Sequence, residues 1–278
     1  MKFNFHTHST YSDGKNTIEE LTKEAIRLDF DIVGISDHGY VPFPSDWNAA
    51  EITIDKYFKE IDDIEQKYLG KIKLLKGVEA DFVEGVCNID IYKKYNFDYI
   101  IGSVHYFPFK FENGYYFNFD TTEKMFLEGL KLFFDNNIPK MIERYYENVM
   151  EMIQTSTPTI VGHLDIIGKF NFNQKYFNQN SPKYLKLVDK VLDTIKNKNV
   201  IMEINARRKY KNFHLDVSPA QNIIQMALKK DIPITISGDV HAKEDFGKYW
   251  EDTLSLVQKI GYNQIVFHNG LKWENYKI

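Results

Sequence analysis

The chain has 278 residues, of which 43% are hydrophobic and 27% charged, a balance typical of soluble globular proteins. Its formal net charge of −4 argues against a surface built to bind nucleic acid, although it allows a small basic pocket. No stretch reaches the roughly 18 apolar residues of a membrane span, and the N-terminus lacks the apolar run of a signal peptide. We therefore expect a cytoplasmic protein without a membrane partner.

Short apolar runs alternate with longer amphipathic stretches along the whole chain. Enrichment in Ile, Val and Phe predicts strands at residues 2–5, 31–36, 72–78, 97–103, 159–162, 200–204, 232–237 and 264–267. The amphipathic stretches predict helices at residues 17–28, 54–68, 122–133, 140–153, 182–196, 219–229 and 250–260. Asn16 or Thr17 can cap the first of these helices, and Ser218 followed by Pro219 predicts the start of the sixth.

The regular alternation of strands and helices predicts parallel strands joined by right-handed crossovers. About eight strands favour a closed barrel, and a doubly wound open sheet is the alternative. No low-complexity linker or repeat divides the sequence, so we expect a single domain over residues 1–278. The long aromatic segment 107–137 predicts an insertion after the fourth strand and is a candidate lid over the barrel mouth.

Polar side chains follow nearly every predicted strand. In chain order these residues are His6 and His8, Asp37 and His38, Glu79 and Asp81, His105, His163 and Asp165, Glu203 and Asn205, and Asp239 and His241. Because the carboxyl ends of parallel strands meet at one face, these side chains should converge. One histidine after a strand is more often structural, but six of the eight histidines at such positions favour a metal site.

The spacing of these residues suits metal binding. In His6-Thr7-His8 and Asp239-Val240-His241 the outer side chains share one face of an extended chain, because strands repeat every two residues. Glu79 is the best candidate to bridge two cations. Asp13 follows Ser12 in a turn signal, and alone it would be read as a turn-capping residue. The single cysteine, Cys87, is expected to be a packed thiol rather than a ligand.

Six short motifs resemble those of the PHP (polymerase and histidinol phosphatase) superfamily and occur in the family order. They are His6-Thr7-His8-Ser9 with Asp13-Gly14 behind it, Ser36-Asp37-His38, Gly77-Val78-Glu79 with Asp81, Gly102-Ser103-Val104-His105, Gly162-His163-Leu164-Asp165 and Ser237-Gly238-Asp239-Val240-His241. The chain length and the fourth and fifth motifs are most similar to those of histidinol-phosphate phosphatases.

The resemblance implies a distorted TIM-like (β/α)7 barrel that carries three divalent ions. Carried over by position, the first ion would be held by His6, His8, Glu79 and Asp239, the second by Glu79, His105 and His163, and the third by Asp13, His38 and His241. Some family members have histidine at the position of Asp13, which could change the metal or the affinity of the third site. The nitrogen and carboxylate donors suit zinc, iron or manganese.

The resemblance also implies hydrolysis of a phosphate monoester by a metal-bridging hydroxide, with Asp239, His241 and Glu79 as candidate catalytic residues. The leading substrate is the small molecule L-histidinol phosphate, an intermediate of histidine biosynthesis. Another PHP phosphoesterase, acting on phosphotyrosine or on nucleotides, is an alternative, and so is a metal-binding module without turnover. The acidic balance disfavours a nucleic-acid substrate, and the complete ligand set disfavours an inert module.

Arginines after the sixth strand are the candidate phosphate contacts, because a guanidinium binds phosphate in a bidentate manner. We rank Arg208 first and Arg207 second, with Ser103 as a further candidate substrate contact. The alternative for the arginines is a solvated basic cluster. His214 and His268 match no ligand motif, so structural or surface roles are expected for both.

Overall fold

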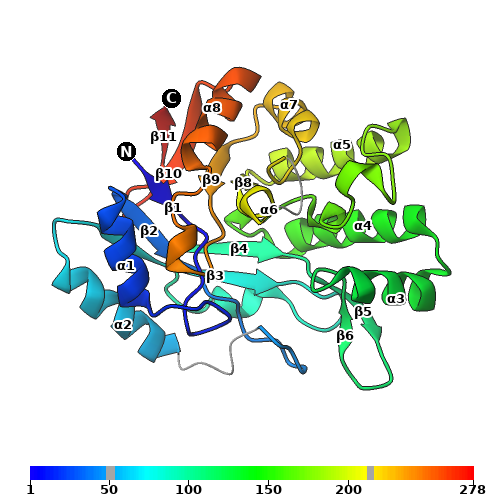
Figure 1. The fold of residues 1–278 in the computed structure, drawn as a ribbon, viewed down its shortest axis with the longest axis horizontal. Helices are drawn as coiled ribbons and strands as arrows, with labels where there is room; N and C mark the ends of the chain where they lie inside the picture. Colours follow the sequence, from blue (N-terminus) through cyan, green and yellow to red (C-terminus); the bar gives the residue numbers. More distant parts are fainter. Residues whose placement is uncertain (48–53, 212–215) are drawn as a thin grey trace.

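The structure, a computed structural model, describes residues 1–47, 54–211 and 216–278. Seven parallel strands form one sheet in the order β1–β2–β3–β4–β7–β8–β9, surrounded by helices (Figure 1). Their bounds are Phe3–Asn4 for β1, Ile32–Ile35 for β2, Lys73–Asp81 for β3, Tyr99–Ser103 for β4, Ile160–Val161 for β7, Ile201–Asn205 for β8 and Ile234–Ser237 for β9. Within the described ranges no helix has the length and apolarity needed to cross a membrane.

The two edges of the sheet meet just beyond the ends of β1 and β9. Thr7 pairs in parallel with Val240. The backbone N–H of His8 donates to the carbonyl of Val240 (2.7 Å), and the N–H of Val240 donates to the carbonyl of His6 (3.0 Å). These bonds close a distorted seven-stranded barrel, which confirms the barrel prediction over the open sheet.

The seven predicted helices are all present within a few residues of their predicted bounds. The helices are α1 (Ile18–Arg27), α2 (Ile54–Lys67), α3 (Glu123–Phe134), α4 (Ile138–Ser156), α5 (Pro182–Asn197), α6 (Arg207–Tyr210), α7 (Gln221–Lys229) and α8 (Trp250–Ile260). Of these, only the short α6 was not predicted. Thr17 caps α1 as expected, because its hydroxyl accepts from the N–H of Glu20 while the Glu20 carboxylate accepts from the N–H of Thr17.

The prediction that the last apolar run is an eighth barrel strand is wrong. β10 (Gln264–His268) pairs antiparallel with β11 (Trp273–Lys277) in a separate two-stranded sheet. Phe267 of this hairpin stacks on Phe3 (5.9 Å between ring centroids), and Trp273 packs edge-on against Phe5 (5.2 Å). The run is apolar because the hairpin packs against the barrel.

The predicted start of the sixth helix is also wrong. α7 begins at Gln221, and the preceding residue, Ala220, makes no side-chain hydrogen bond to cap the helix. The hydroxyl of Ser218 donates instead to Asp165 (2.5 Å), a buried carboxylate that is distant in sequence. Asp216 accepts from the N–H of Gln221 (3.1 Å) and so takes the place of the expected cap.

The segment 107–137 contains most of a two-stranded hairpin and the helix α3. β5 (Tyr106–Lys110) pairs antiparallel with β6 (Tyr116–Asn118), and α3 follows. Phe107 packs against Phe117 (5.5 Å) and against Phe134 of α3 (5.0 Å), so the segment is held by its own aromatic contacts. A lid function stays a prediction.

The Tyr99 ring packs inside the barrel against the backbones of the paired strands β2 and β3. Its side chain is buried, and its hydroxyl donates to the carbonyl of Phe5 (2.7 Å). A methyl group added at Gly34 would lie 2.0 Å from the Tyr99 hydroxyl, and one at Gly77 would lie 2.3 Å from the ring. Two neighbouring strands therefore carry glycine because the ring occupies the space that a side chain would need.

We expect Gly34→Ala to destabilise the protein by about 1–3 kcal/mol, the usual cost of overpacking a core. The same change should cost less in a Tyr99→Phe background, because the closest clashing atom is the hydroxyl oxygen. Urea denaturation of the four proteins in this cycle measures the difference. An equal cost in both backgrounds would show that Tyr99 does not select glycine here.

Candidate metal centre

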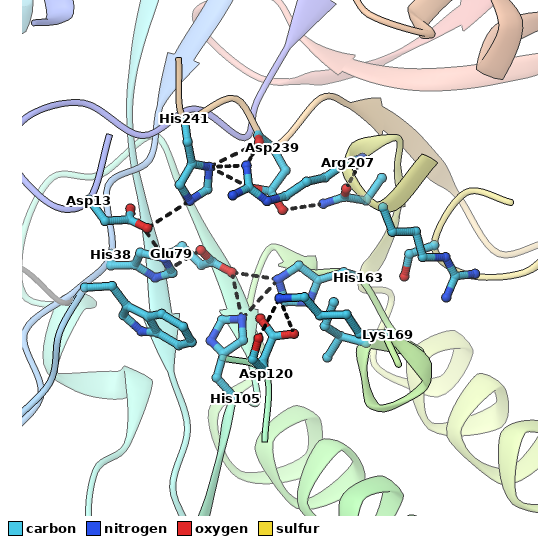
Figure 2. Close-up of a pocket in the computed structure, with 15 residues that line it drawn as sticks. Asp13, His38, Glu79, His105, Asp120, His163, Lys169, Arg207, Asp239 and His241 are labelled. Carbon is cyan, nitrogen blue, oxygen red and sulfur yellow. Dashed lines mark hydrogen bonds and ion pairs between the residues drawn. The ribbon is translucent and has the colours of Figure 1, made fainter. Parts of the chain in front are cut away.

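The nine side chains predicted to bind metal lie together at the carboxyl ends of the barrel strands. They are His6, His8, Asp13, His38, Glu79, His105, His163, Asp239 and His241, and groups of them bring their ligand atoms within 4.8 Å of one another. All are buried except Asp13 and His241, which are partly exposed at the mouth. Figure 2 shows seven of them around the pocket.

Glu79 lies between two groups of histidines, and Figure 2 shows it beside the second group, His105 and His163. Its Oε2 is 3.1 Å from His6 Nε2 and 3.4 Å from His8 Nε2. Its Oε1 is 2.9 Å from His163 Nε2 and 3.6 Å from His105 Nε2. Each carboxylate oxygen thus faces a different set of nitrogen donors, which is the geometry that a bridging ligand requires.

The distances within each set fit metal coordination. Ligand atoms about 2.0–2.2 Å from a tetrahedral metal are roughly 3.3–3.6 Å apart. In the first set, Asp239 Oδ1 lies 3.6 Å from His8 Nε2 and 3.9 Å from His6 Nε2. In the second set, His105 Nε2 and His163 Nε2 are 3.2 Å apart.

A third set lies at the mouth of the pocket. Asp13 Oδ2 is 3.2 Å from His241 Nε2, and Asp13 Oδ1 is 3.9 Å from His38 Nε2. His8 also reaches this set, because its Nδ1 is 3.7 Å from Asp13 Oδ1. The structure therefore brings together the three residues expected there and adds His8 at their border.

Several buried polar atoms of the cluster form no hydrogen bond among the described residues. They are His6 Nε2, both ring nitrogens of His8, Asp13 Oδ1, His38 Nδ1, His163 Nδ1 and Asp239 Oδ1. Leaving such a group unsatisfied costs about 1–3 kcal/mol, so a cluster of them is stable only with a partner. A cation accepts these lone pairs, and the donor set present here fits one.

Carboxylates behind the cluster orient the histidines. Glu203 accepts from His6 Nδ1 (2.6 Å) and from the backbone N–H of His163 (2.7 Å). Asp81 lies 2.7 Å from His105 Nδ1. Bonding Nδ1 to a carboxylate leaves Nε2 free to face a metal and raises the basicity of the ring. The strand-end positions of Glu203 and Asp81 were visible in the sequence, but these roles were not.

The loop that carries Asp13 is held by Asp37. This buried carboxylate accepts from the N–H and hydroxyl of Ser9 (both 2.7 Å) and from the hydroxyl of Ser12 (2.6 Å). Burial raises the pKa of Asp37 above its usual value despite these bonds. Asp37 is thus tied to the loop, while the next residue, His38, faces the cluster.

The charges in the cluster shift one another strongly. Burial alone would raise the pKa of Glu79, but His6, His38 and His163 outweigh it and hold that pKa well below the usual value. Burial alone would also raise the pKa of Asp239, but His6, Arg207 and His241 hold that pKa well below its usual range. Glu79 and Asp239 are therefore ionised at neutral pH, as metal ligands must be.

The three predicted substrate contacts lie in different surroundings. Arg208 lines the pocket, but its guanidinium is buried against Asp165. Arg207 is partly exposed at the mouth, and its Nη1 donates to the carbonyl of Asp239 (2.8 Å) and to His241 Nδ1 (2.7 Å). The buried Ser103 hydroxyl donates to Glu79 Oε1 (2.7 Å), so it orients the central carboxylate.

Other pocket-lining residues were missed in the sequence. They are Trp47, Asp120, Ile166 and Lys169. The Trp47 ring stacks on His38 (5.6 Å, 14° between the planes), and Lys169 Nζ is 3.0 Å from Asp120 Oδ1 (Figure 2). All four lie outside the strands, so strand-end reasoning had no means of finding them.

Three remaining predictions concern residues outside the cluster. Cys87 is partly buried, burial raises its pKa to about 12, and it is in none of the metal-ligand groups found among the described residues. His268 is buried, accepts from the N–H of Gly270 (3.1 Å) and packs on Trp273, which is a structural role. His214 lies outside the described residues.

We expect Glu203→Gln to weaken metal retention roughly 10- to 100-fold, the usual effect of removing the partner of a ligand histidine. The amide loses the charge that orients His6. Zinc affinity measured against a competing chelator tests this, with Asp81→Asn as the matched change behind His105. If neither variant altered the affinity of any ion, the orienting role would be excluded.

Known proteins of one family are similar to this chain in sequence. The PHP domain family model matches residues 4–207. A Schizosaccharomyces pombe protein named probable histidinol-phosphatase is 24% identical, with 95% of this chain and 89% of the relative covered. The histidinol-phosphatase of Bacillus subtilis is 24% identical, with 88% and 96% covered.

A solved structure shares the fold. The histidinol phosphate phosphatase of Lactococcus lactis subsp. lactis, crystallised with zinc, L-histidinol and phosphate, has a TM-score of 0.72. The alignment covers 98% of both chains at 18% sequence identity.

Proposed function

This chain belongs to the PHP domain family, and we propose that it is a metal-dependent phosphatase that hydrolyses L-histidinol phosphate to L-histidinol and phosphate. The observation that carries the reaction class is Glu79, whose two oxygens face two separate sets of histidines. The names of the relatives support the substrate, because both act on histidinol phosphate by name and are covered nearly end to end.

We assign three ions of zinc, iron or manganese to the cluster, with zinc favoured by the Lactococcus lactis complex. His6, His8, Glu79 and Asp239 would hold the first, Glu79, His105 and His163 the second, and Asp13, His38 and His241 the third, a division that the distances within each set support. When bound, such ions take up phosphoryl oxygens, neutralise charge in the transition state and make water more acidic.

The side chains around the cluster supply the rest of the chemistry. Asp239 is held ionised, so its carboxylate can accept a hydrogen bond from the attacking water and orient it. Its Oδ2 accepts from the side-chain amide of Asn205 (3.1 Å), which keeps Oδ1 turned toward His6 and His8. Arg207 presents a positive charge at the mouth, where the doubly charged ester would enter.

The outer wall of the pocket suits the leaving group. Asp120 offers a carboxylate to an ammonium group, although it shares that charge with Lys169. Trp47 offers a flat aromatic face beside the metal ligands. L-Histidinol carries both an amino group and a flat ring, so each of its features meets a matching surface. A nucleotide offers a flat base to Trp47 but carries no ammonium group for Asp120.

We expect Glu79→Ala to lower kcat/KM for histidinol phosphate by at least about 10³-fold, or about 4 kcal/mol of transition-state stabilisation. The loss follows because no other carboxylate among the residues that the structure describes faces both histidine sets. Steady-state kinetics of metal-supplemented protein measures it, with the exposed Glu251→Ala as a control for the change in charge. Retained activity would remove the bridging role of Glu79.

A substrate panel tests the leaving group. We expect hydrolysis of histidinol phosphate to exceed that of phosphotyrosine and nucleoside monophosphates by at least about tenfold in kcat/KM, a difference of about 1.4 kcal/mol. Release of inorganic phosphate is measured for each at equal enzyme concentration. Comparable rates on all three would leave a phosphatase but contradict the assignment to histidinol phosphate.

A further inference from the structure

Arg208 and Asp165 form an ion pair deep beside the metal centre. The guanidinium is 2% exposed and the carboxylate 0%. Arg208 Nη1 donates to Asp165 Oδ1 and Nη2 donates to Oδ2, both at 3.1 Å. Asp165 is not among the residues that line the pocket. The pair is therefore bidentate and shielded from water on the carboxylate side.

Most hydrogen-bond donors of Arg208 are already engaged within the protein. Besides the two bonds to Asp165, Nε donates to the carbonyl of Asp216 (3.3 Å) and Nη2 to the carbonyl of Val217. A guanidinium has five N–H groups, so four are used. Turning Arg208 toward a phosphate would leave a buried carboxylate without its cation, which is strongly unfavourable.

The other partners of Asp165 connect this pair to the metal ligands. Asp165 accepts from the hydroxyl of Ser218 (2.5 Å) and the N–H of Ala220 (3.0 Å). The backbone of Ser218 pairs in both directions with Asn205 at the end of β8 (2.7 and 2.9 Å). The Asn205 side chain in turn donates to Asp239 (3.1 Å). A continuous chain of hydrogen bonds therefore links the Arg208–Asp165 pair to Asp239, a proposed metal ligand.

We propose that Arg208 and Asp165 are a positioning pair, and that Arg207 rather than Arg208 is the guanidinium that contacts phosphate. The pair joins the segment after β7, which carries His163, to the segment after β8, which carries Arg207. It also holds residues 216–220 against both. This inference rests on the proposed function only in taking phosphate as the bound group.

The test is the affinity of the metal-loaded, full-length protein for inorganic phosphate, measured by equilibrium dialysis. We expect Arg207→Met to weaken it at least about tenfold, because that change removes the contact itself. Asp165→Asn should also weaken it by about tenfold, although Asp165 does not face the pocket. A role in stability alone would lower Tm and leave the phosphate affinity of the folded variant unchanged.

The double variant Asp165→Asn/Arg208→Met separates a positioning role of Arg208 from a phosphate contact. The asparagine introduced by Asp165→Asn keeps an acceptor for Ser218 and Ala220 but needs no cation beside it. The double variant should therefore bind phosphate about as well as Asp165→Asn, whereas Arg208→Met alone, which leaves the buried carboxylate unpaired, should bind far more weakly. A folded double variant as weak as Arg208→Met would make Arg208 a phosphate contact and overturn the proposal. Unchanged phosphate affinity in Asp165→Asn would also overturn it, even if the other variants did not fold.

Failure of the proposed function has a different signature. In that case wild-type protein would bind inorganic phosphate but would not hydrolyse histidinol phosphate. The phosphate measurements on the variants would still decide between Arg207 and Arg208.

Discussion

A carboxylate buried at the centre of the barrel mouth imposes the main constraint on this structure. Glu79 is 1% exposed and lies within 3.6 Å of nitrogen atoms from five histidines. An ionised carboxylate is very costly to bury without compensating positive charge. The side chains around Glu79 can compensate its charge only when their own buried nitrogen and oxygen atoms also have partners. The arrangement therefore requires cations, and the remaining ligands are placed where cations would complete it.

The barrel is what brings these ligands together. Six of the seven barrel strands contribute ligands at or just beyond their carboxyl ends, and β8 contributes Glu203, which bonds His6. Closure between Thr7 and Val240 places the first motif beside the last. A second layer of groups then limits how the ligands can turn. Glu203 and Asp81 bond the outer nitrogens of His6 and His105, and Ser103 bonds the central carboxylate. Geometry of this kind is rigid because it is built on strands rather than on long loops.

Much of the fold and of the candidate ligand set could be predicted from the sequence, because both depend on local patterns. Apolar runs followed by His, Asp or Glu identified all seven barrel strands. The same signal misplaced β10, since an apolar run looks alike whether it lies in the barrel or packs against it. The cap assigned to Ser218 failed because its hydroxyl bonds Asp165, a residue far away in the chain. Adjacent arginines cannot be told apart from sequence, but burial separates Arg208 from Arg207.

The proposed chemistry depends on Glu79 bridging two ions. Anomalous diffraction from crystals of metal-loaded protein, recorded at the absorption edge of the bound metal, tests this role most directly. We expect two peaks roughly 3.5–4 Å apart, one beside each oxygen of Glu79, the spacing found in two-metal hydrolases. A third peak is expected near Asp13. A single peak, or two peaks that both leave one Glu79 oxygen without a metal neighbour, would exclude the bridging role.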